Sequence, residues 1–322
     1  MMEGMSATLT AQQRLNLAYD SLNGLSVGDA LGNHFLTADL PPPDSVPDLT
    51  AGPLPATPWS WTDDTEMACS IVDMLHHQGG IDPDLLARQF ADRCDPRRSY
   101  GPGATRVLRQ IRNGVGWDHA AQAVFGGVGS YGNGAAMRIA PLGAFFADDL
   151  DRAVEHALRS ARVTHQHPEG VAGGVAVALA AAYAAATRLE GRHPDPAWLL
   201  DRVTEHPALT GTEVHQALSR ARDLLGCSLP EAVRALGNGS QVTAQDTVPF
   251  AVWVAATHLT DYPSAISCCA AAGGDADTTA AIVGGIVAAH TGIGDVPGVT
   301  GIPHSWLDAR EPFPAWLIPS AR

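Results

Sequence analysis

Three glycines near the N-terminus of the chain, Gly24, Gly28 and Gly32, recur at every fourth position. They end a segment whose apolar residues have helical spacing, which predicts a helix over residues 9–31. Residues four apart share one face of a helix, so the glycines form a stripe without side chains. Such a stripe lets the backbone of a second helix approach closely.

Apolar residues with helical spacing continue along most of the 322 residues, and no strong alternating strand, internal repeat or linker is found. Further helices are predicted over residues 67–77, 82–95, 104–113, 133–146, 151–163, 169–189, 196–206, 214–225, 232–236, 248–259, 263–272 and 280–290. Residues 40–58 are rich in proline and are predicted to form a loop. We therefore expect one mostly helical domain over residues 1–322, with a core at about residues 10–292 and an irregular tail over residues 293–322.

Composition excludes several classes of function. A net charge of −14 argues against a nucleic-acid groove or an anionic membrane partner. All 20 basic residues are arginine, which excludes a P-loop lysine and a Schiff-base lysine. The N-terminus has no signal-peptide pattern, and the apolar run at residues 171–186 is shorter than the ~20 residues that span a bilayer. Five cysteines without a CxxC pair favour a reduced, cytoplasmic compartment.

Acidic residues cluster at two places that are far apart in the sequence. Residues 273–279 read Gly-Gly-Asp-Ala-Asp-Thr-Thr, and the carboxylates of Asp275 and Asp277 can converge on one point. Adjacent carboxylates repel unless a cation lies between them, and oxygen ligands suit Mg²⁺, Mn²⁺ or Ca²⁺. The second cluster, Thr-Asp-Asp-Thr at residues 62–65, ends 210 residues before Asp275. Helix capping would explain one acid there, but not two acids between two hydroxyls.

Three other features allow more than one interpretation. Asp29 is either a capping or surface acid, or an acid that orients a metal ligand. Residues 127–132 match G-x-G-x-x-G, but no strand precedes them, so a dinucleotide fold is rejected and a phosphate-binding glycine loop before a helix is expected. His165 and His167 lack partners at zinc spacing. They are either loop or cap residues, or His165 contacts a ligand.

Five segments, taken together and in this order, resemble the ADP-ribosylglycohydrolases, the group that includes dinitrogenase reductase-activating glycohydrolase. The segments are residues 28–32 (Gly-Asp-Ala-Leu-Gly), 61–65 (Trp-Thr-Asp-Asp-Thr), 130–138 (Ser-Tyr-Gly-Asn-Gly-Ala-Ala-Met-Arg), 164–165 (Thr-His) and 273–278 (Gly-Gly-Asp-Ala-Asp-Thr). The resemblance implies an all-α, orthogonal multi-helix bundle with a binuclear Mg²⁺ or Mn²⁺ site. Many members carry a glutamate shortly after the first segment, whereas here the first acid is Asp39.

The resemblance also implies roles for individual residues. The metal ligands would be Thr62, Asp63, Asp64, Asp275, Asp277 and Thr278. The catalytic residues would be Asp63, Asp64 and Asp277, with Asp63 or Asp277 accepting a proton from the attacking water. The substrate contacts would be Asp29, Tyr100, Gly101, Ser130, Tyr131, Gly132, Asn133, Gly134, Met137 and His165.

The function implied by the resemblance is metal-dependent hydrolysis of ADP-ribosyl-arginine on proteins, with ADP-ribose as the product. One alternative is an O-linked substrate, on serine, a nucleic acid or a small ester. Another is an inactive ADP-ribose-binding or structural protein of the same fold. A Ca²⁺-stabilised structural site at residues 275–277 is a weaker alternative, because the glycine and glutamate of an EF-hand loop are missing. We expect a monomer without a membrane partner, and nucleic acid only as a modified substrate.

Overall fold

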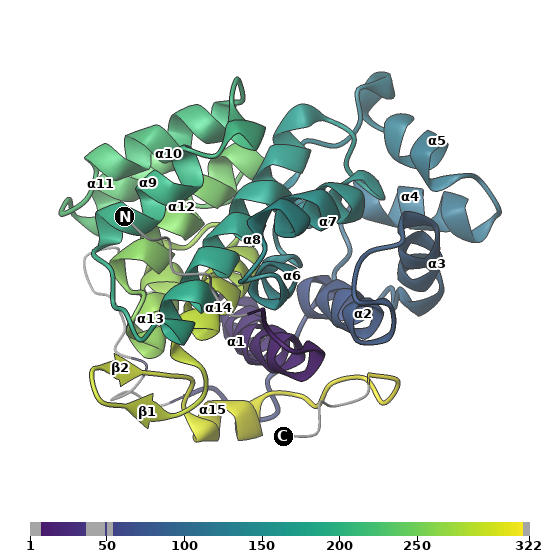
Figure 1. The fold of residues 1–322 in the computed structure, drawn as a ribbon. Coiled ribbons are helices and arrows are strands. Elements are labelled where there is room, and N and C mark those ends of the chain that lie inside the picture. The colour runs from purple at the N-terminus through teal and green to yellow at the C-terminus, as the bar shows by residue number, and fades with distance from the viewer. Residues whose placement is uncertain (1–7, 37–48, 50–53, 318–322) are drawn as a thin grey trace.

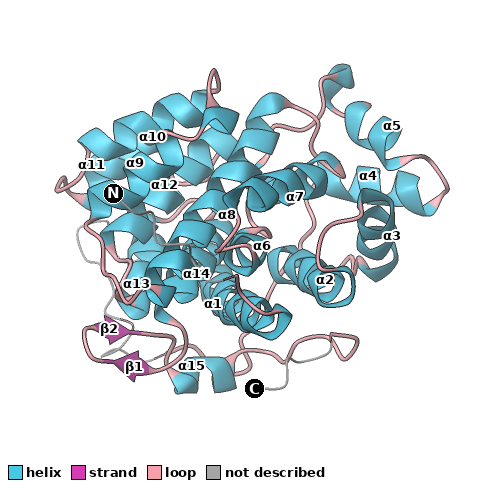
Figure 2. Ribbon diagram, in the orientation of Figure 1, coloured by secondary structure: helices cyan, strands magenta, loops and turns pink. Residues whose placement is uncertain are grey.

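The computed structural model describes residues 8–36, 49 and 54–317. These residues form an all-α bundle, as expected, with one short hairpin at its edge (Figures 1 and 2). The helices are α1 (Ala11–Leu36), α2 (Asp63–Gln78), α3 (Pro83–Arg93), α4 (Pro102–Arg112), α5 (Trp117–Gln122), α6 (Ala140–Phe145), α7 (Leu150–Arg162), α8 (Pro168–Leu189), α9 (Pro196–Thr204), α10 (Glu213–Asp223), α11 (Leu229–Leu236), α12 (Ala244–Thr257), α13 (Tyr262–Ala272), α14 (Ala276–Thr291) and α15 (His304–Ala309). The antiparallel strands β1 (Asp295–Val296) and β2 (Val299–Thr300) form the hairpin.

Helices α1, α8 and α14 lie at the centre of the bundle, and other helices surround them (Figure 1). All sixteen residues of α14 are buried. Helix α8 is long and apolar enough to cross a membrane by length and composition, but 83% of its most apolar window is buried inside the protein. Its apolar surface is therefore covered by neighbouring helices.

The glycine stripe of α1 packs directly against α14, which confirms the predicted close approach. A Cβ atom added to Gly28 would lie 2.1 Å from the carbonyl oxygen of Ala280, and one added to Gly24 would lie 2.3 Å from that of Gly284. At the other end of the stripe, a Cβ atom on Gly32 would lie 2.5 Å from the Cα of Asp277. The two helices therefore run antiparallel, and the end of α1 is fixed against the start of α14.

The prediction of one continuous helix over residues 133–146 is wrong. The chain forms only a 3-10 turn at Asn133–Ala135, and α6 begins at Ala140. Pro141 lies in the first turn of α6, a position that favours a helix start and not a helix interior. Between the two elements, the buried Arg138 guanidinium donates to the backbone oxygen of Ser160 and to the Thr164 hydroxyl.

Other differences concern short elements. Helix α5 was not predicted, and α12 begins at Ala244, before the helix predicted over residues 248–259. The tail was expected to be irregular, but it contains the hairpin and α15, and Trp306 is buried against the bundle. Most of the predicted loop over residues 40–58, together with Asp39, lies outside the described residues.

Candidate active site

Both acidic segments lie at the N-terminal ends of helices and face one cavity of about 530 Å³. Asp63 and Asp64 form the first turn of α2, and Asp275 is the N-cap residue of α14, with Asp277 in its first turn. All four carboxylates line the cavity, and so does Thr278. The sequence predicted these five residues in one place.

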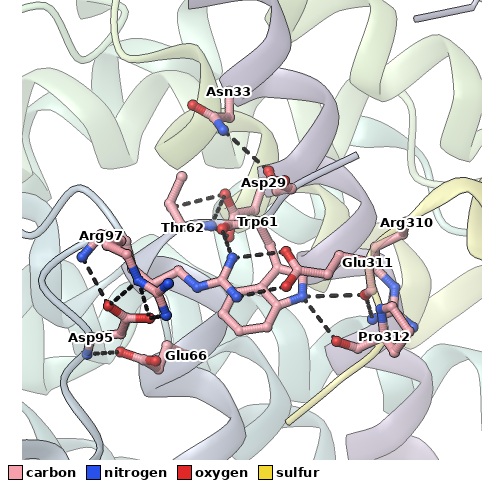
Figure 3. A network of polar contacts seen from close by, with 12 residues as sticks. Asp29, Asn33, Trp61, Thr62, Glu66, Asp95, Arg97, Arg310, Glu311 and Pro312 are labelled. Carbon is pink, nitrogen blue, oxygen red and sulfur yellow. Dashed lines mark hydrogen bonds and ion pairs between the residues drawn. The ribbon is translucent and has the colours of Figure 1, made fainter. Parts of the chain in front are cut away.

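Thr62 and Asp29 do not line this cavity and bind each other beneath it. The buried Asp29 carboxylate accepts hydrogen bonds from the Thr62 hydroxyl (2.8 Å), the Thr62 amide (3.0 and 3.1 Å) and the Thr65 hydroxyl (2.6 Å), as Figure 3 shows in part. The Thr65 amide donates to it as well (3.1 Å). Asp29 was expected to contact the substrate, but it does not line the cavity. It instead holds the start of α2 from the neighbouring helix α1.

The carboxyl groups of the cavity are buried among like charges. Burial, and then the neighbouring Asp29, raise the pKa of Asp63 to about 8. Burial and then Asp275 raise the pKa of Asp277 to about 8, and burial raises the pKa of Asp64 well above its usual value. Each charged form is disfavoured here unless a cation balances it.

A divalent ion would suit these donors. Asp64 Oδ2 is buried and has no hydrogen-bond partner, although a carboxylate oxygen rarely stays unpaired inside a protein. Oxygen donors of this kind are the ligands that Mg²⁺ and Mn²⁺ prefer. In the part of the chain that the structure describes, no three Asp, Glu, His or Cys side chains already form a closed metal site.

The glycine loop at residues 130–134 forms a second wall of the cavity. Asn133 links this loop to the second acidic segment, because its amide donates to Asp275 Oδ2 (2.7 Å) and to the Thr247 hydroxyl (3.0 Å). The backbone N–H of Asn133 donates to the carbonyl of Val242, and the N–H of Gly132 to the Ser130 hydroxyl. These two N–H groups already have partners, so neither of them is free to bind a phosphate as the glycine-loop prediction expected.

His165 lines the cavity behind the glycine loop, and Met137 lines it nearby. The Nδ1 atom of His165 lies 2.7 Å from the Thr164 hydroxyl. Burial, and then the Arg138 guanidinium, lower the pKa of His165 to about 3. The imidazole is therefore neutral at physiological pH and can exchange hydrogen bonds with a ligand without adding charge.

The two neighbouring residues Tyr100 and Gly101, both expected to contact the substrate, differ in their position relative to the cavity. Gly101 lines the cavity, as expected for a substrate contact. Tyr100 is not part of the lining, and its hydroxyl donates to Glu66 Oε2 (2.7 Å). Tyr100 therefore contacts the helix that carries the first acidic segment and not the cavity.

Strained backbone marks cavity residues that the sequence did not reveal. Within the described residues, the non-glycine residues with positive φ are Ser99 (66°), Phe125 (53°) and Val242 (56°), and all three line the cavity. Such conformations are uncommon for β-branched and bulky residues and concentrate at ligand sites. Phe125 is 53% exposed, and its ring centroid lies 5.6 Å from that of Tyr131.

Comparison with known proteins identifies the family of this chain. The profile of the ADP-ribosylglycohydrolase family matches residues 10–320. ADP-ribosylhydrolase ARH3 of Homo sapiens is 30% identical over 341 residues, covering 91% of this chain and 88% of the relative. ADP-ribosylarginine hydrolase Tri1 of Pseudomonas putida (strain GB-1) is 27% identical, covering 95% and 77%.

A solved structure shares the fold as well. An ADP-ribosylglycohydrolase-related protein complex contains a chain that superposes with a TM-score of 0.65 at 25% identity, and 93% of each chain is covered. Because the profile spans nearly the whole chain and the ARH3 relative matches over nine tenths of it, the chain belongs to the ADP-ribosylglycohydrolase family, a family of ADP-ribosyl hydrolases.

Proposed function

We propose that the cavity hydrolyses the bond between ADP-ribose and a modified arginine side chain of a protein. The observation that carries this proposal is the meeting of two acidic segments, far apart in sequence, with a glycine loop at one cavity of about 530 Å³. Cavities of this size hold ligands the size of a nucleotide sugar. The arginine linkage is supported by the name of the Tri1 relative, an ADP-ribosylarginine hydrolase.

The cavity offers a different surface to each part of ADP-ribose. The rings of Phe125 and Tyr131 line the cavity and are exposed, so they can stack on the adenine, because aromatic rings favour offset-stacked contacts. The hydroxyls of Ser130 and Tyr131 and the neutral His165 can bind the diphosphate and the ribose beside it. The ribose that carries the scissile bond would then lie against the four aspartates.

Two Mg²⁺ or Mn²⁺ ions, when bound, would neutralise the acidic wall, orient the ribose hydroxyls and activate a water. Asp63, Asp64, Asp275, Asp277 and Thr278 would hold them, since each lines the cavity with an oxygen donor. Thr62 does not line the cavity, but its hydroxyl donates a hydrogen bond to Asp29 and so keeps oxygen lone pairs that could bind an ion.

The aspartates also supply the proton acceptor. A water oxygen attacks the anomeric carbon of the ribose, and the carboxylate of Asp63 or Asp277 accepts the proton that this water loses. The bond from the anomeric carbon to the guanidino nitrogen breaks, its electron pair stays on nitrogen, and that nitrogen takes up a proton. The products are ADP-ribose and unmodified arginine.

A panel of substrates tests this proposal. The purified protein is given ADP-ribose linked to arginine, to serine and to nucleic acid, with Mg²⁺ or with EDTA, and released ADP-ribose is measured. We expect release from the arginine-linked substrate in Mg²⁺ only. Release from the serine-linked or nucleic-acid-linked substrate alone would reassign the linkage, and no release from any of them would favour a protein that binds without catalysis.

A further inference from the structure

The C-terminal segment, residues 309–312, lies beside the start of α2, although none of these four residues lines the cavity (Figure 3). The Trp59 amide donates to the carbonyl of Ala309 (2.8 Å), and the Glu311 amide donates to the carbonyl of Trp59 (2.9 Å). The Trp61 indole N–H donates to the carbonyl of Glu311 (3.2 Å). The segment that leads into the first acidic segment is therefore paired, through an isolated bridge, with residues some 250 positions later in the chain.

Arg98 contacts the residues on both sides of Thr62. Its guanidinium lies 3.5 Å from the centroid of the Trp61 ring and donates from Nη1 to the Trp61 carbonyl (2.9 Å). Its own carbonyl accepts the backbone N–H of Asp63 at 2.7 Å. A single residue thus fixes both the approach to Asp63 and the backbone of Asp63 itself.

Glu311 determines where the Arg98 side chain lies. Its two carboxylate oxygens accept from Nη1 (2.8 Å) and Nη2 (2.7 Å) of Arg98, which is a bidentate pair. The arginine and glutamate side chains are only 18% and 28% exposed. Arginine has many rotamers in solvent, so this pairing removes conformations that would leave Trp61 without its cation.

The first acidic segment is also held by Asp29, through Thr62 and Thr65. Asp63 lies between these two threonines in the chain and lines the cavity. A displacement of about 1 Å in a reacting group can lower a rate by about a hundredfold. We propose that Arg98 and Glu311 are positioning residues for Asp63, so that the C-terminal segment is part of the catalytic apparatus without contacting the substrate. This inference rests on the proposed function.

The variant Glu311→Gln tests this role with little change of shape, because one oxygen of the pair becomes an amide that faces the guanidinium. We expect kcat for ADP-ribose release to fall about tenfold while KM changes less than about twofold, since substrate contacts are untouched. The control is Asp20→Asn, which breaks a similarly half-buried ion pair with Arg188 on α1 and α8 (2.9 Å). The control should keep the wild-type kcat.

Amide hydrogen exchange gives a second readout that needs no activity. In Glu311→Gln we expect faster exchange in the peptide that contains Asp63, whose N–H donates to Arg98, and unchanged exchange in α8 and α14. A wild-type kcat in Glu311→Gln, or exchange that rises equally throughout the protein, would overturn the inference. If the wild-type protein hydrolyses no substrate, the proposed function fails, and the exchange at Asp63 still decides whether Glu311 positions this residue.

Discussion

At the scale of single residues, the site concentrates acidic groups in a buried place where their charges are unfavourable. Asp63, Asp64 and Asp277 all have a raised pKa, and burial is the main cause for each. Carboxylates arranged in this way lower the stability of the folded protein unless a ligand balances them. The arrangement therefore does not serve the stability of the fold, which supports the proposed binding of cations.

The variant Asp64→Asn separates stability from function. We expect it to lose ADP-ribose release by about a hundredfold or more, because a ligating carboxylate becomes a neutral amide. Its melting temperature in EDTA should equal or exceed that of the wild-type protein, since the variant removes the cost of burying an ionisable carboxyl among like charges. Assays of release and thermal unfolding check both parts, and a large loss of melting temperature in EDTA would contradict this account.

A buried histidine outside the cavity makes stability depend on pH. His290 lies 2.9 Å from the Thr187 hydroxyl and 3.2 Å from His193, and its pKa is lowered to about 4, mainly by burial. Between pH 6.5 and 4 the unfolded chain takes up this proton more readily than the folded protein, so unfolding becomes easier as pH falls.

The variant His290→Asn should lack this contribution. Relative to the variant, the wild-type protein should lose roughly 1–3 kcal/mol of unfolding free energy between pH 7 and pH 4. Denaturant unfolding of both proteins at several pH values measures the difference. A difference that stays constant over this range would show that His290 does not titrate on unfolding.

Motifs in the sequence predicted the acidic residues of the cavity better than its other lining residues. Asp63, Asp64 and Asp277 could be predicted because helix capping needs one acid and not two acids beside hydroxyls. Phe125 and Val242 could not, because nothing in the local sequence marks a non-glycine residue with positive φ. Asp29 was recognised as unusual within an apolar face, but its partners follow it by more than thirty residues and became visible only in the fold.

At the scale of elements, the site depends on how closely α1 and α14 pack. Their antiparallel contact sets Gly32 against Asp277, so the helix that carries Asp29 also fixes the start of α14. The fourfold glycine spacing made this contact predictable. The break at residues 136–139 was not predicted, because apolar spacing alone outweighed the helix-start signal of Pro141.

The variant Gly32→Ala tests this contact. Its methyl group would lie 2.3 Å from the carbonyl oxygen of Ala276 and 2.5 Å from the Cα of Asp277, so the helices must separate. We expect a loss of about 1–3 kcal/mol in unfolding free energy, and slower hydrolysis because Asp277 moves.

A matched control is Gly174→Ala in α8, where the added methyl group would meet its nearest atom at 3.5 Å. This variant should be neutral, or more stable by up to about 1 kcal/mol, because alanine favours a helix. Equal stability and activity in both variants would show that the α1–α14 contact does not constrain the site.

At the scale of the whole molecule, residues from α2, the glycine loop, the turn before α8 and α14 meet at one cavity, and the C-terminal segment supports α2 from outside it. The all-α bundle could be predicted from helical spacing and from the family resemblance. The C-terminal elements could not, because β1, β2 and α15 are too short to show periodicity. The role of the residues that follow α15 is visible only through contacts such as that of Arg98 with Glu311.

Binding of the proposed ligands should stabilise the whole molecule. ADP-ribose with Mg²⁺ binds the folded protein only, so we expect the melting temperature to rise with ligand concentration, by an amount equivalent to about 2.7 kcal/mol at one hundred times Kd. Asp64→Asn should show a smaller rise with Mg²⁺. An unchanged melting temperature at millimolar ADP-ribose and Mg²⁺ would show that the cavity does not bind them.

The central claim is that this acidic cavity releases ADP-ribose from a modified side chain. Single-turnover hydrolysis of an ADP-ribosyl-arginine peptide, measured for the wild-type protein and for Asp64→Asn in Mg²⁺ and in EDTA, tests it most directly. The account predicts release by the wild-type protein in Mg²⁺ and loss of release in EDTA or in the variant. Full release by Asp64→Asn in Mg²⁺ would contradict it.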